Sequence, residues 1–478
     1  MQNKIKQMYK YLIQKIKWLK YRYFTKHNIL KWWYIYKLKL YFSFRQFKKY
    51  LHPAEFQKHC LITWMTGSWK SELLKYLIHF FINTQKQKAS IIVCDPHGDV
   101  ADEIFNHKYI NHDNVVYFHP LLFDKEHIFG INPFGYKLND DEIEVYASEL
   151  ALVFEEMIKS SSSLTLNMKS LLVPCITVLL KRENSSLKEL QRFMTANNED
   201  LVTLGTKSLN PSIANFFKYN FNDQIYSITK QSISVKIQSL LNSHIFTKIT
   251  TSNNTVNLKE LIDDKKIIIF NLSKWLLGSE VSQALWRFIV ALTQSIAISR
   301  AKEEKRFRVP TYLFIDEFTN YTTKSIKSIL EESRKYHLHL IVATQLLWKN
   351  IDPILKESIL SNTNVKMIGA NAYVQQLSLA KETQIEKNDL LNLRVWNFYI
   401  KSKFAKSFLY DVPKIFVWTK YTHSKMIIDV CLFTQFKMYY QKHIQERKED
   451  NILKPLFEIE DNDTKRKITK DIRGSSDI

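Results

Sequence analysis

Short apolar runs alternate with amphipathic stretches along most of the chain, and this alternation predicts a β-sheet covered by helices. Seven of the runs are mainly apolar at consecutive positions rather than at every second position, as in strands that are buried on both faces. This order is typical of an α/β fold with a mainly parallel sheet. We expect strands at 59–63, 90–94, 115–118, 266–270, 312–315, 338–342 and 365–368, and helices between them at 72–83, 280–300 and 324–336.

The sequence between the third and the fourth expected strand contains no further strand-like run. Helical periodicity predicts helices at 143–159, 167–182, 187–195, 211–220 and 228–241. We therefore expect five regions: a basic, aromatic-rich helical arm at 1–50, the first part of the α/β domain at 51–140, an all-α insertion domain at 141–250, the second part of the α/β domain at 251–415, and a C-terminal extension with a disordered charged tail at 416–478.

Positive charge is concentrated at the N-terminus. The net charge is +22, and the first 54 residues contain 14 Lys and Arg but no Asp or Glu. Such an arm suits an anionic membrane surface or the phosphates of a nucleic acid, and a solvated helical arm is the alternative. We expect a cytoplasmic protein that contacts the inner face of the cell membrane peripherally through residues 1–50.

Two further observations bear on the compartment. No stretch reaches the roughly 18 uncharged apolar residues of a membrane-spanning helix, and the N-terminal segment lacks the apolar core of a signal peptide. Cys60, Cys94, Cys175 and Cys431 stand far apart, so neither a disulfide framework nor a zinc site is indicated. A reducing cytosol fits this usage.

A phosphate-binding pattern follows the first expected strand. The pattern G-x-x-x-x-G-K-[ST] between a strand and a helix is met by Lys70 and Ser71, but tryptophan occupies both glycine positions. The loop needs positive φ and close backbone approach to phosphate at those positions, which an indole side chain opposes. The residues expected to bind nucleotide are Trp64, Met65, Thr66, Gly67, Ser68, Trp69, Lys70, Ser71 and Glu72.

The two tryptophans admit two interpretations. Either the loop is a relic in a protein that binds no nucleotide, or UGA codons are decoded as glycine in the cell, as in some bacterial lineages. The composition favours recoding, because the chain has 8 Gly and 10 Trp, whereas about 7% glycine is usual. Codons 64 and 69 of the gene, or peptide masses of native protein, distinguish the two. Other tryptophans at positions that suit glycine are Trp275, Trp286, Trp348 and Trp396.

Two acids follow the apolar strand at 312–315, as in a Walker B motif. Asp316 would hold Mg²⁺ together with Ser71, and Glu317 would polarise the attacking water. Lys70 would contact the β- and γ-phosphates of ATP. An apolar run that ends in Asp-Glu also occurs by chance, but its pairing with Lys70-Ser71 makes the interpretation specific.

Three other polar residues have a functional and a structural interpretation each. Gln345 follows an expected strand, where it would reach the γ-phosphate or simply cap a loop. Arg334 ends an expected helix, where it would complement the helix dipole or act in trans as an arginine finger. Asp95 would contact the catalytic water or cap a turn.

These motifs together resemble the TraG/TraD-type coupling ATPases of type IV secretion and conjugation, within the HerA/FtsK superfamily. The resemblance covers about residues 50–410 and rests on the segments 61–75, 95–99, 131–133, 271–274, 314–320, 333–338 and 343–345. It implies a RecA-like P-loop ATPase with ATP and Mg²⁺, in which Lys70 and Ser71 bind nucleotide and magnesium, Asp316 and Glu317 form the Walker B pair, and Gln345 senses the γ-phosphate. The tryptophans depart from the family pattern, and the usual N-terminal transmembrane anchor is not recognised.

The resemblance also implies a homo-oligomeric ring, usually a hexamer, that pumps DNA without sequence preference. We therefore expect an ATP-dependent DNA translocase that delivers DNA to a type IV secretion or conjugation channel, with secretion-channel proteins as partners. One alternative is an FtsK- or HerA-like DNA pump in segregation or DNA processing. The other is a catalytically inactive DNA-binding ring scaffold, if Trp64 and Trp69 are genuine.

Overall fold

The computed structural model describes part of the 478-residue chain, and all of the described residues belong to one compact unit that extends to Lys442. The expected basic arm at 1–50, apart from Phe47, and the expected tail beyond 442 lie outside the described residues. The described residues are 47, 51, 53–65, 70–85, 88–108, 110–122, 127–158, 165–196, 198–253, 255–318, 324–345, 352–402, 407–412 and 422–442.

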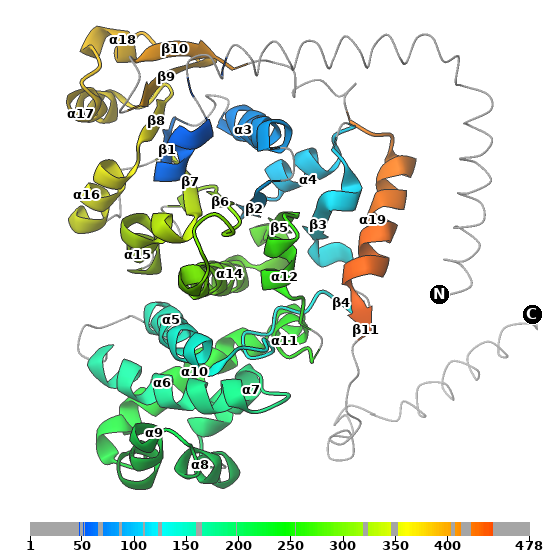
Figure 1. Cartoon of the computed structure of the whole chain (residues 1–478), viewed down its shortest axis with the longest axis vertical. Coiled ribbons are helices and arrows are strands. Elements are labelled where there is room, and N and C mark those ends of the chain that lie inside the picture. Colours follow the sequence, from blue (N-terminus) through cyan, green and yellow to red (C-terminus); the bar gives the residue numbers. More distant parts are fainter. Residues whose placement is uncertain are drawn as a thin grey trace, which may run out of the picture. The chain divides into compact units, whose positions relative to one another are not determined.

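A nine-stranded sheet forms the centre of the unit, with the order β10-β9-β8-β1-β7-β6-β2-β5-β3 (Figure 1). The seven strands from β8 to β3 are parallel, and β9 and β10 extend the sheet antiparallel at one end. The mainly parallel α/β sheet expected from the sequence is thereby confirmed. The strands are β1 Cys60–Thr63, β2 Ser90–Asp95, β3 Val115–Phe118, β5 Ile267–Asn271, β6 Thr311–Ile315, β7 Leu338–Thr344, β8 Val365–Ile368, β9 Asn397–Ser402 and β10 Phe408–Asp411.

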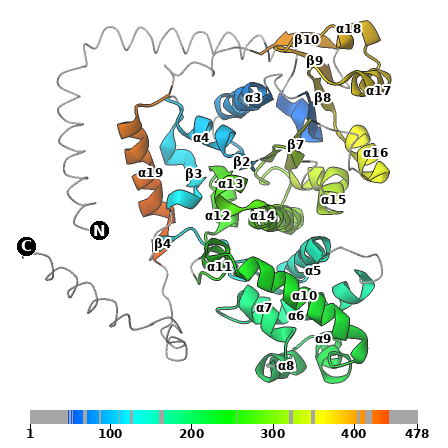
Figure 2. The same ribbon diagram turned by 180° about the vertical axis from the view of Figure 1, so that it is seen from behind.

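Helices cover both faces of the sheet (Figures 1 and 2). The apolar side chains of α3 (Lys70–Gln85) and α4 (Asp99–Phe105) form one core with the sheet. Those of α12 (Leu258–Asp263), α14 (Ser279–Ser299) and α15 (Lys324–Glu332) belong to the other core. The segment Ser279–Lys302 is long and apolar enough to cross a membrane, but 83% of its most apolar window is buried in the fold, as in a core helix.

The described part of the segment between β4 (His127–Ile128) and α12 is helical, and α5 packs on α14 beneath the sheet. The two chain segments that enter and leave this helical region run side by side. Gly130 and Thr255 form an isolated β-bridge, and the Val256 N–H donates to the Gly130 carbonyl at 3.0 Å. The helices are α5 Asp140–Ile158, α6 Thr165–Lys181, α7 Leu187–Phe193, α8 Glu199–Thr206, α9 Pro211–Asn215, the π-helical η4 Phe216–Asn220, α10 Ser227–Leu241 and α11 His244–Thr250.

Further elements precede the first strand of the sheet, connect its strands or follow its last strand in the chain. The first expected strand is preceded by a 3-10 helix, η1, and another, η8, precedes β7. They are η1 Pro53–Lys58, α13 Lys274–Leu277, η8 Ser333–Tyr336, α16 Pro353–Asn362, α17 Tyr373–Thr383, α18 Lys387–Leu391, α19 Lys425–Tyr439 and β11 Gln441–Lys442, which pairs with β4.

Helix α19 lies along the edge strand β3 and satisfies its main-chain groups (Figure 2). The side chain of Gln435 accepts from the Tyr117 N–H at 2.8 Å and donates to the Val115 carbonyl at 2.9 Å. The Tyr440 hydroxyl accepts from the His119 N–H at 2.8 Å. An open strand edge is a template for pairing with other chains, and this helix closes one such edge with side chains.

Four histidines connect α3 with the segment that leads into α19. The His79 and His107 rings lie 4.5 Å apart, and the His112 and His423 rings 5.8 Å apart. Burial lowers the pKa of all four, well below the usual value for His79, to about 3 for His107 and to about 4 for His423. The charges of Lys75 and Lys108 lower the pKa of His107 further.

The contact between α19 and β3 yields a stability prediction. Gln435→Leu keeps the volume of the side chain but leaves the Tyr117 N–H and the Val115 carbonyl buried and unpaired. Unpaired buried polar groups cost about 1–3 kcal/mol each, so for the two groups we expect about 2–6 kcal/mol of destabilisation in urea unfolding. The exposed neighbour Thr434 provides the control, and a loss for Gln435→Leu no larger than that for Thr434→Ala contradicts the edge-sealing role.

The histidine cluster predicts acid sensitivity. A histidine in the unfolded chain takes up a proton at about pH 6.5. His107 and His423 in the folded protein stay neutral to a lower pH. Between the unfolded and the folded pKa the unfolded state therefore binds more protons, so this contribution to stability is complete above about pH 6.5 and is lost as the pH falls toward the folded values of about 3 to 4. Urea midpoints measured across this range should fall less steeply for His107→Asn than for the parent. His97→Asn, at an exposed position, is the matched control, and equal slopes in all three proteins refute the assignment.

Candidate functional site

Three expected site segments meet at the carboxyl edge of the sheet, because the strands that carry them are adjacent and parallel. Thr63 at the end of β1 pairs with Thr344 of β7, and Ile315 of β6 pairs with Val342 of β7. The phosphate-binding pattern therefore leaves the sheet one strand from Gln345 and two strands from Asp316. Thr66, Gly67, Ser68 and Trp69 lie outside the described residues, while Lys70 begins α3 and Ser71 is half-buried in its first turn.

Trp64 prolongs β1 instead of turning out of it. Its N–H donates to the Thr344 carbonyl at 3.3 Å, and its indole is 2% exposed within the core beside α3. Positive φ occurs among the described non-glycine residues at six positions, and Trp64 is not one of them. Trp64 therefore does not adopt the positive φ that the phosphate-binding pattern predicts for this position, and its ring lies in the core. Met65 follows on the surface, and its N–H donates to Ala370 at 2.6 Å.

The Walker B pair lies next to Gln345. Asp316 and Glu317 are buried at the end of β6, and the Asp316 carboxylate accepts from the Glu317 N–H at 2.8 Å. Glu317 has a φ of 51°, a strained conformation for a residue with a side chain. The Gln345 amide donates to the Glu317 carboxylate at 2.5 Å. This contact fixes the orientation of the carboxylate that the sequence assigns to water activation.

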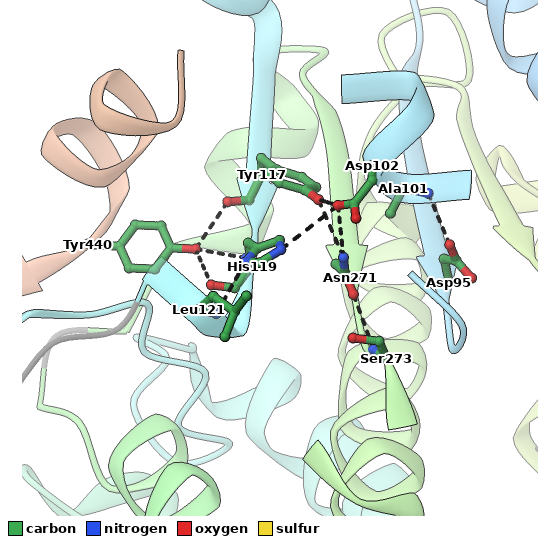
Figure 3. Close-up of polar contacts among 9 residues, drawn as sticks. All are labelled: Asp95, Ala101, Asp102, Tyr117, His119, Leu121, Asn271, Ser273 and Tyr440. Carbon is green, nitrogen blue, oxygen red and sulfur yellow. Dashed lines mark hydrogen bonds and ion pairs between the residues drawn. The ribbon is translucent and has the colours of Figure 1, made fainter. Parts of the chain in front are cut away.

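Asp95 caps the turn after β2, and the structure thus resolves the two interpretations of this residue. Its carboxylate oxygens accept from the N–H group of His97 at 2.9 Å and from that of Ala101 at 2.9 Å (Figure 3). Gly98 in the same turn has a φ of 92°, and a Cβ there would lie 2.8 Å from the Asn271 amide oxygen. Both observations explain the Asp-Pro-His-Gly-Asp segment as a turn that starts α4.

Glu72 is part of a buried ion pair within α3. The Lys75 ammonium donates to its carboxylate at 2.5 Å and also contacts Glu103 of α4. Burial raises the pKa of Glu72, although the Lys75 charge opposes the shift. Lys75 therefore links α3 to α4, and the side chain of Glu72 is engaged by Lys75 within α3.

A second polar cluster at the carboxyl edge was not found from the sequence. Asp102 of α4 accepts from the Tyr117 hydroxyl and from the Asn271 amide, and the His119 ring lies 3.8 Å from the same oxygen (Figure 3). The Tyr440 hydroxyl bonds the main chain at His119 (Figure 3). The cluster connects the turn after β2 with α19. The polar side chains come from four separate segments, so no local sequence motif identifies the cluster.

Arg334 lies at the opposite edge of the sheet from the other site residues. It is exposed in η8, directly before β7, whereas Gln345 directly follows β7. Seven strand residues at about 3.3 Å each separate the two edges by about 20 Å. Arg334 therefore has no role at the phosphate site of its own subunit.

A cavity of about 530 Å³ surrounds Arg334 at this amino edge. Cations dominate its lining, with Lys58, Lys366 and Lys401 against Glu331 and Glu382. Burial, with the nearby Arg334 charge, lowers the pKa of His59 to about 4, and burial also lowers the pKa of Lys366. The cavity thus has the electrostatic character of an anion site.

The other tryptophans at expected glycine positions differ in their surroundings. Trp275 is 75% exposed on α13, and Trp396 is half-buried in the turn before β9. Trp286 is 1% exposed within α14, where glycine would leave a cavity and would weaken the helix. Trp348 lies outside the described residues.

Comparisons with solved structures identify the fold. The unbound form of the bacterial conjugative coupling protein TrwBdeltaN70 aligns with a TM-score of 0.57 and 14% identity, over 75% of this chain and 85% of that one. The plasmid coupling protein TrwB aligns in complex with ADPNP (TM-score 0.53, 13% identity, 75% and 86% covered) and in complex with ADP and Mg²⁺ (0.53, 14%, 76% and 86%). These likenesses show that the chain has the RecA-like P-loop NTPase fold of TrwB.

A comparison with curated proteins gives no match. A comparison with protein families matches residues 40–293, just over half of the chain, to the family described as "Helicase HerA, central domain". This match confirms the HerA/FtsK resemblance. The chain therefore belongs to the HerA helicase central-domain family.

Proposed function

We propose that the protein is an ATP-hydrolysing DNA translocase of the coupling type, which delivers DNA to a type IV secretion or conjugation channel. The observation that carries the proposal is the contact between Gln345 and Glu317, beside the junction of β1 and α3. Glu317 follows β6, two strands from β1, and is held by the amide of Gln345 on the intervening strand β7, so a positioned carboxylate lies near the Lys-Ser start of α3, as hydrolysis of a bound triphosphate requires. The TrwB structures with ADPNP and with ADP and Mg²⁺ support nucleotide as the ligand.

The described residues fit this chemistry. Asp316 lies with its carboxylate at the end of β6, and Ser71 lies in the first turn of α3, so both supply the oxygen ligands that Mg²⁺ prefers. Bound Mg²⁺ supplies charge neutralisation at the β- and γ-phosphates. Lys70 contacts the same phosphates, Glu317 orients and polarises the attacking water, and Gln345 reports the γ-phosphate through its bond to Glu317.

We also propose that positions 64 and 69 are glycine in the cell. The count of 8 glycines in 478 residues supports this, as does the intact Lys70-Ser71 that follows. Backbone strain is no argument at 64, since Trp64 is extended and buried. The argument at 69 is the close approach of phosphate to the residue before the lysine.

The proposed motor acts as a homo-oligomeric ring, a hexamer by the family resemblance, with DNA held through its phosphates. Arg334 supports a ring, since it completes a phosphate site only if it enters the site of a neighbouring subunit. The basic segment 1–50 supports a peripheral position at the inner face of the cell membrane, in the cytoplasm and near secretion-channel proteins.

A HerA-like DNA pump in DNA processing or segregation is the second candidate, which the family match at residues 40–293 favours. The inactive ring scaffold is the outcome if no form of the protein binds nucleotide. Both alternatives have the same fold as the proposed coupling ATPase. The DNA pump differs from it in its partners, and the scaffold differs in lacking ATP hydrolysis.

The first test is DNA-stimulated ATP hydrolysis by the full chain with Trp64→Gly and Trp69→Gly. We expect activity in this form, no activity with both tryptophans, and loss of activity when Lys70→Ala is added, because the phosphate contact is removed. Trp69→Gly alone, which keeps the buried Trp64 and so leaves no cavity in the core, is expected to restore at least nucleotide binding.

Glu317→Gln separates chemistry from binding in the same assay. It should retain ATP binding and lose hydrolysis, since an amide does not polarise water as a carboxylate does. The motor is refuted if the double-glycine form is folded but binds no ATP, and the scaffold is refuted if that form hydrolyses ATP in a Lys70-dependent manner.

Arg334 gives a separate test of the trans arrangement. In the double-glycine form, Arg334→Ala should lower hydrolysis by about a thousandfold or more, while ATP binding persists. Mixing Arg334→Ala subunits with Lys70→Ala subunits should restore activity. In the mixed ring, the Lys70→Ala subunit supplies its Arg334 to the intact nucleotide site of the neighbouring Arg334→Ala subunit. Lys335→Ala, at the exposed neighbouring position, should remain active. If the mixture stays inactive although the two variants assemble together, Arg334 does not act in trans.

A further inference from the structure

The order of strands at the carboxyl edge gives the bound nucleotide a direction. Asp316 and Glu317 follow β6, and Gln345 follows β7, so the groups that act on the γ-phosphate all lie on one side of β1. In the proposed ATPase the triphosphate tail, a linear chain, would be bound by the loop that follows β1. Its nucleoside end must therefore leave toward the other side of β1, where β8 is the adjacent strand.

The turn after β8 is joined to the beginning of the phosphate-binding loop. The Gly369 N–H donates to the Thr63 carbonyl at 2.8 Å, and the Met65 N–H donates to the Ala370 carbonyl at 2.6 Å. The Asn371 amide donates to the Gly369 carbonyl at 2.9 Å and approaches the Thr63 hydroxyl at 3.5 Å. Residues 369–371 thus extend the wall of the phosphate site by one strand, at a spacing of about 4.8 Å.

The helix α17 begins directly after this turn and presents large side chains to solvent. Tyr373 is 59% exposed and Val374 is 75% exposed, in the first turn of α17. The Lys387 ammonium lies over the Tyr373 ring at 5.7 Å from its centroid. The position of the helix is fixed by Gln376, whose amide donates to the Leu390 carbonyl at 2.9 Å and to the Gly369 carbonyl at 3.4 Å.

We propose that the turn at 369–371 and the first turn of α17 hold the nucleoside of the bound nucleotide, with the Tyr373 ring stacked on the base; this rests on the proposed ATPase function. Tyr373 offers a π-face that is independent of the identity of the base, and Val374 provides an apolar side wall. Asn371 is a positioning residue, because its amide ties the end of β8 to the end of β1.

The test compares ATP with inorganic tripolyphosphate, which has the phosphate tail but no nucleoside. Binding of each, with Mg²⁺, is measured by calorimetry on the full chain with Trp64→Gly and Trp69→Gly. Tyr373→Ala should weaken ATP binding about tenfold, within the range of a base–aromatic stack, and leave tripolyphosphate binding unchanged. Tyr373→Phe should retain the affinity for ATP, since the ring is preserved.

Tyr219 in the helical segment is the matched control, because it is a tyrosine of similar exposure, 69%, far from this edge in the fold. Tyr219→Ala should alter neither affinity. The inference is overturned if Tyr373→Ala leaves ATP binding intact, or if it weakens ATP and tripolyphosphate equally. A parent that binds neither compound refutes the proposed ATPase itself, so the two failures are distinguishable.

Discussion

The parallel register of β1, β7 and β6 is the constraint on which the candidate site depends. Each strand ends at the same edge, with Thr63 opposite Thr344 and Ile315 opposite Val342, so the residues that follow them emerge together. The hydrogen bonds of the sheet thereby bring Glu317 within reach of Gln345 although other structure separates them in the chain. A slip of one residue in any of these strands would exchange the side chains that pack in the two cores on either face of the sheet. The buried core therefore maintains the register, and the register maintains the site.

The sequence predicted the parallel part of the sheet because fully buried strands are continuous apolar runs. It missed β9 and β10, since half-buried strands at a sheet end carry alternating polar residues, as in Asn397–Ser402. It also missed α19 as the seal of β3. Gln435 is a polar residue in a helix, which by pattern alone belongs on the surface, and its partners are about 320 positions away. Local patterns identify elements, whereas pairing between distant segments becomes visible only in the fold.

In the candidate site, too, local patterns predicted some features, whereas contacts between distant segments could not be predicted. Lys70, Asp316, Glu317 and Gln345 follow strands, and strand ends can be identified from sequence, so their convergence was predictable. The cluster around Asp102 was not, because Asp102, Tyr117 and Asn271 lie in separate segments whose local patterns predict elements and not contacts between them. The two roles considered for Asp95 could not be separated by pattern either. Only the bonds from its carboxylate to His97 and Ala101 assign it to the turn.

Tryptophan has different consequences at the two positions of the loop. Trp64 is extended, hydrogen-bonded to β7 and buried, so an indole there is compatible with the sheet. Removing it would cost core packing, as for any buried aromatic side chain, and would leave a cavity next to α3. Position 69 directly precedes Lys70, the first residue of α3, where main-chain N–H groups must approach the phosphates without an intervening side chain. The approach of phosphate therefore argues for glycine at position 69, whereas the argument for glycine at position 64 is the low glycine count of the chain and not the geometry of the sheet.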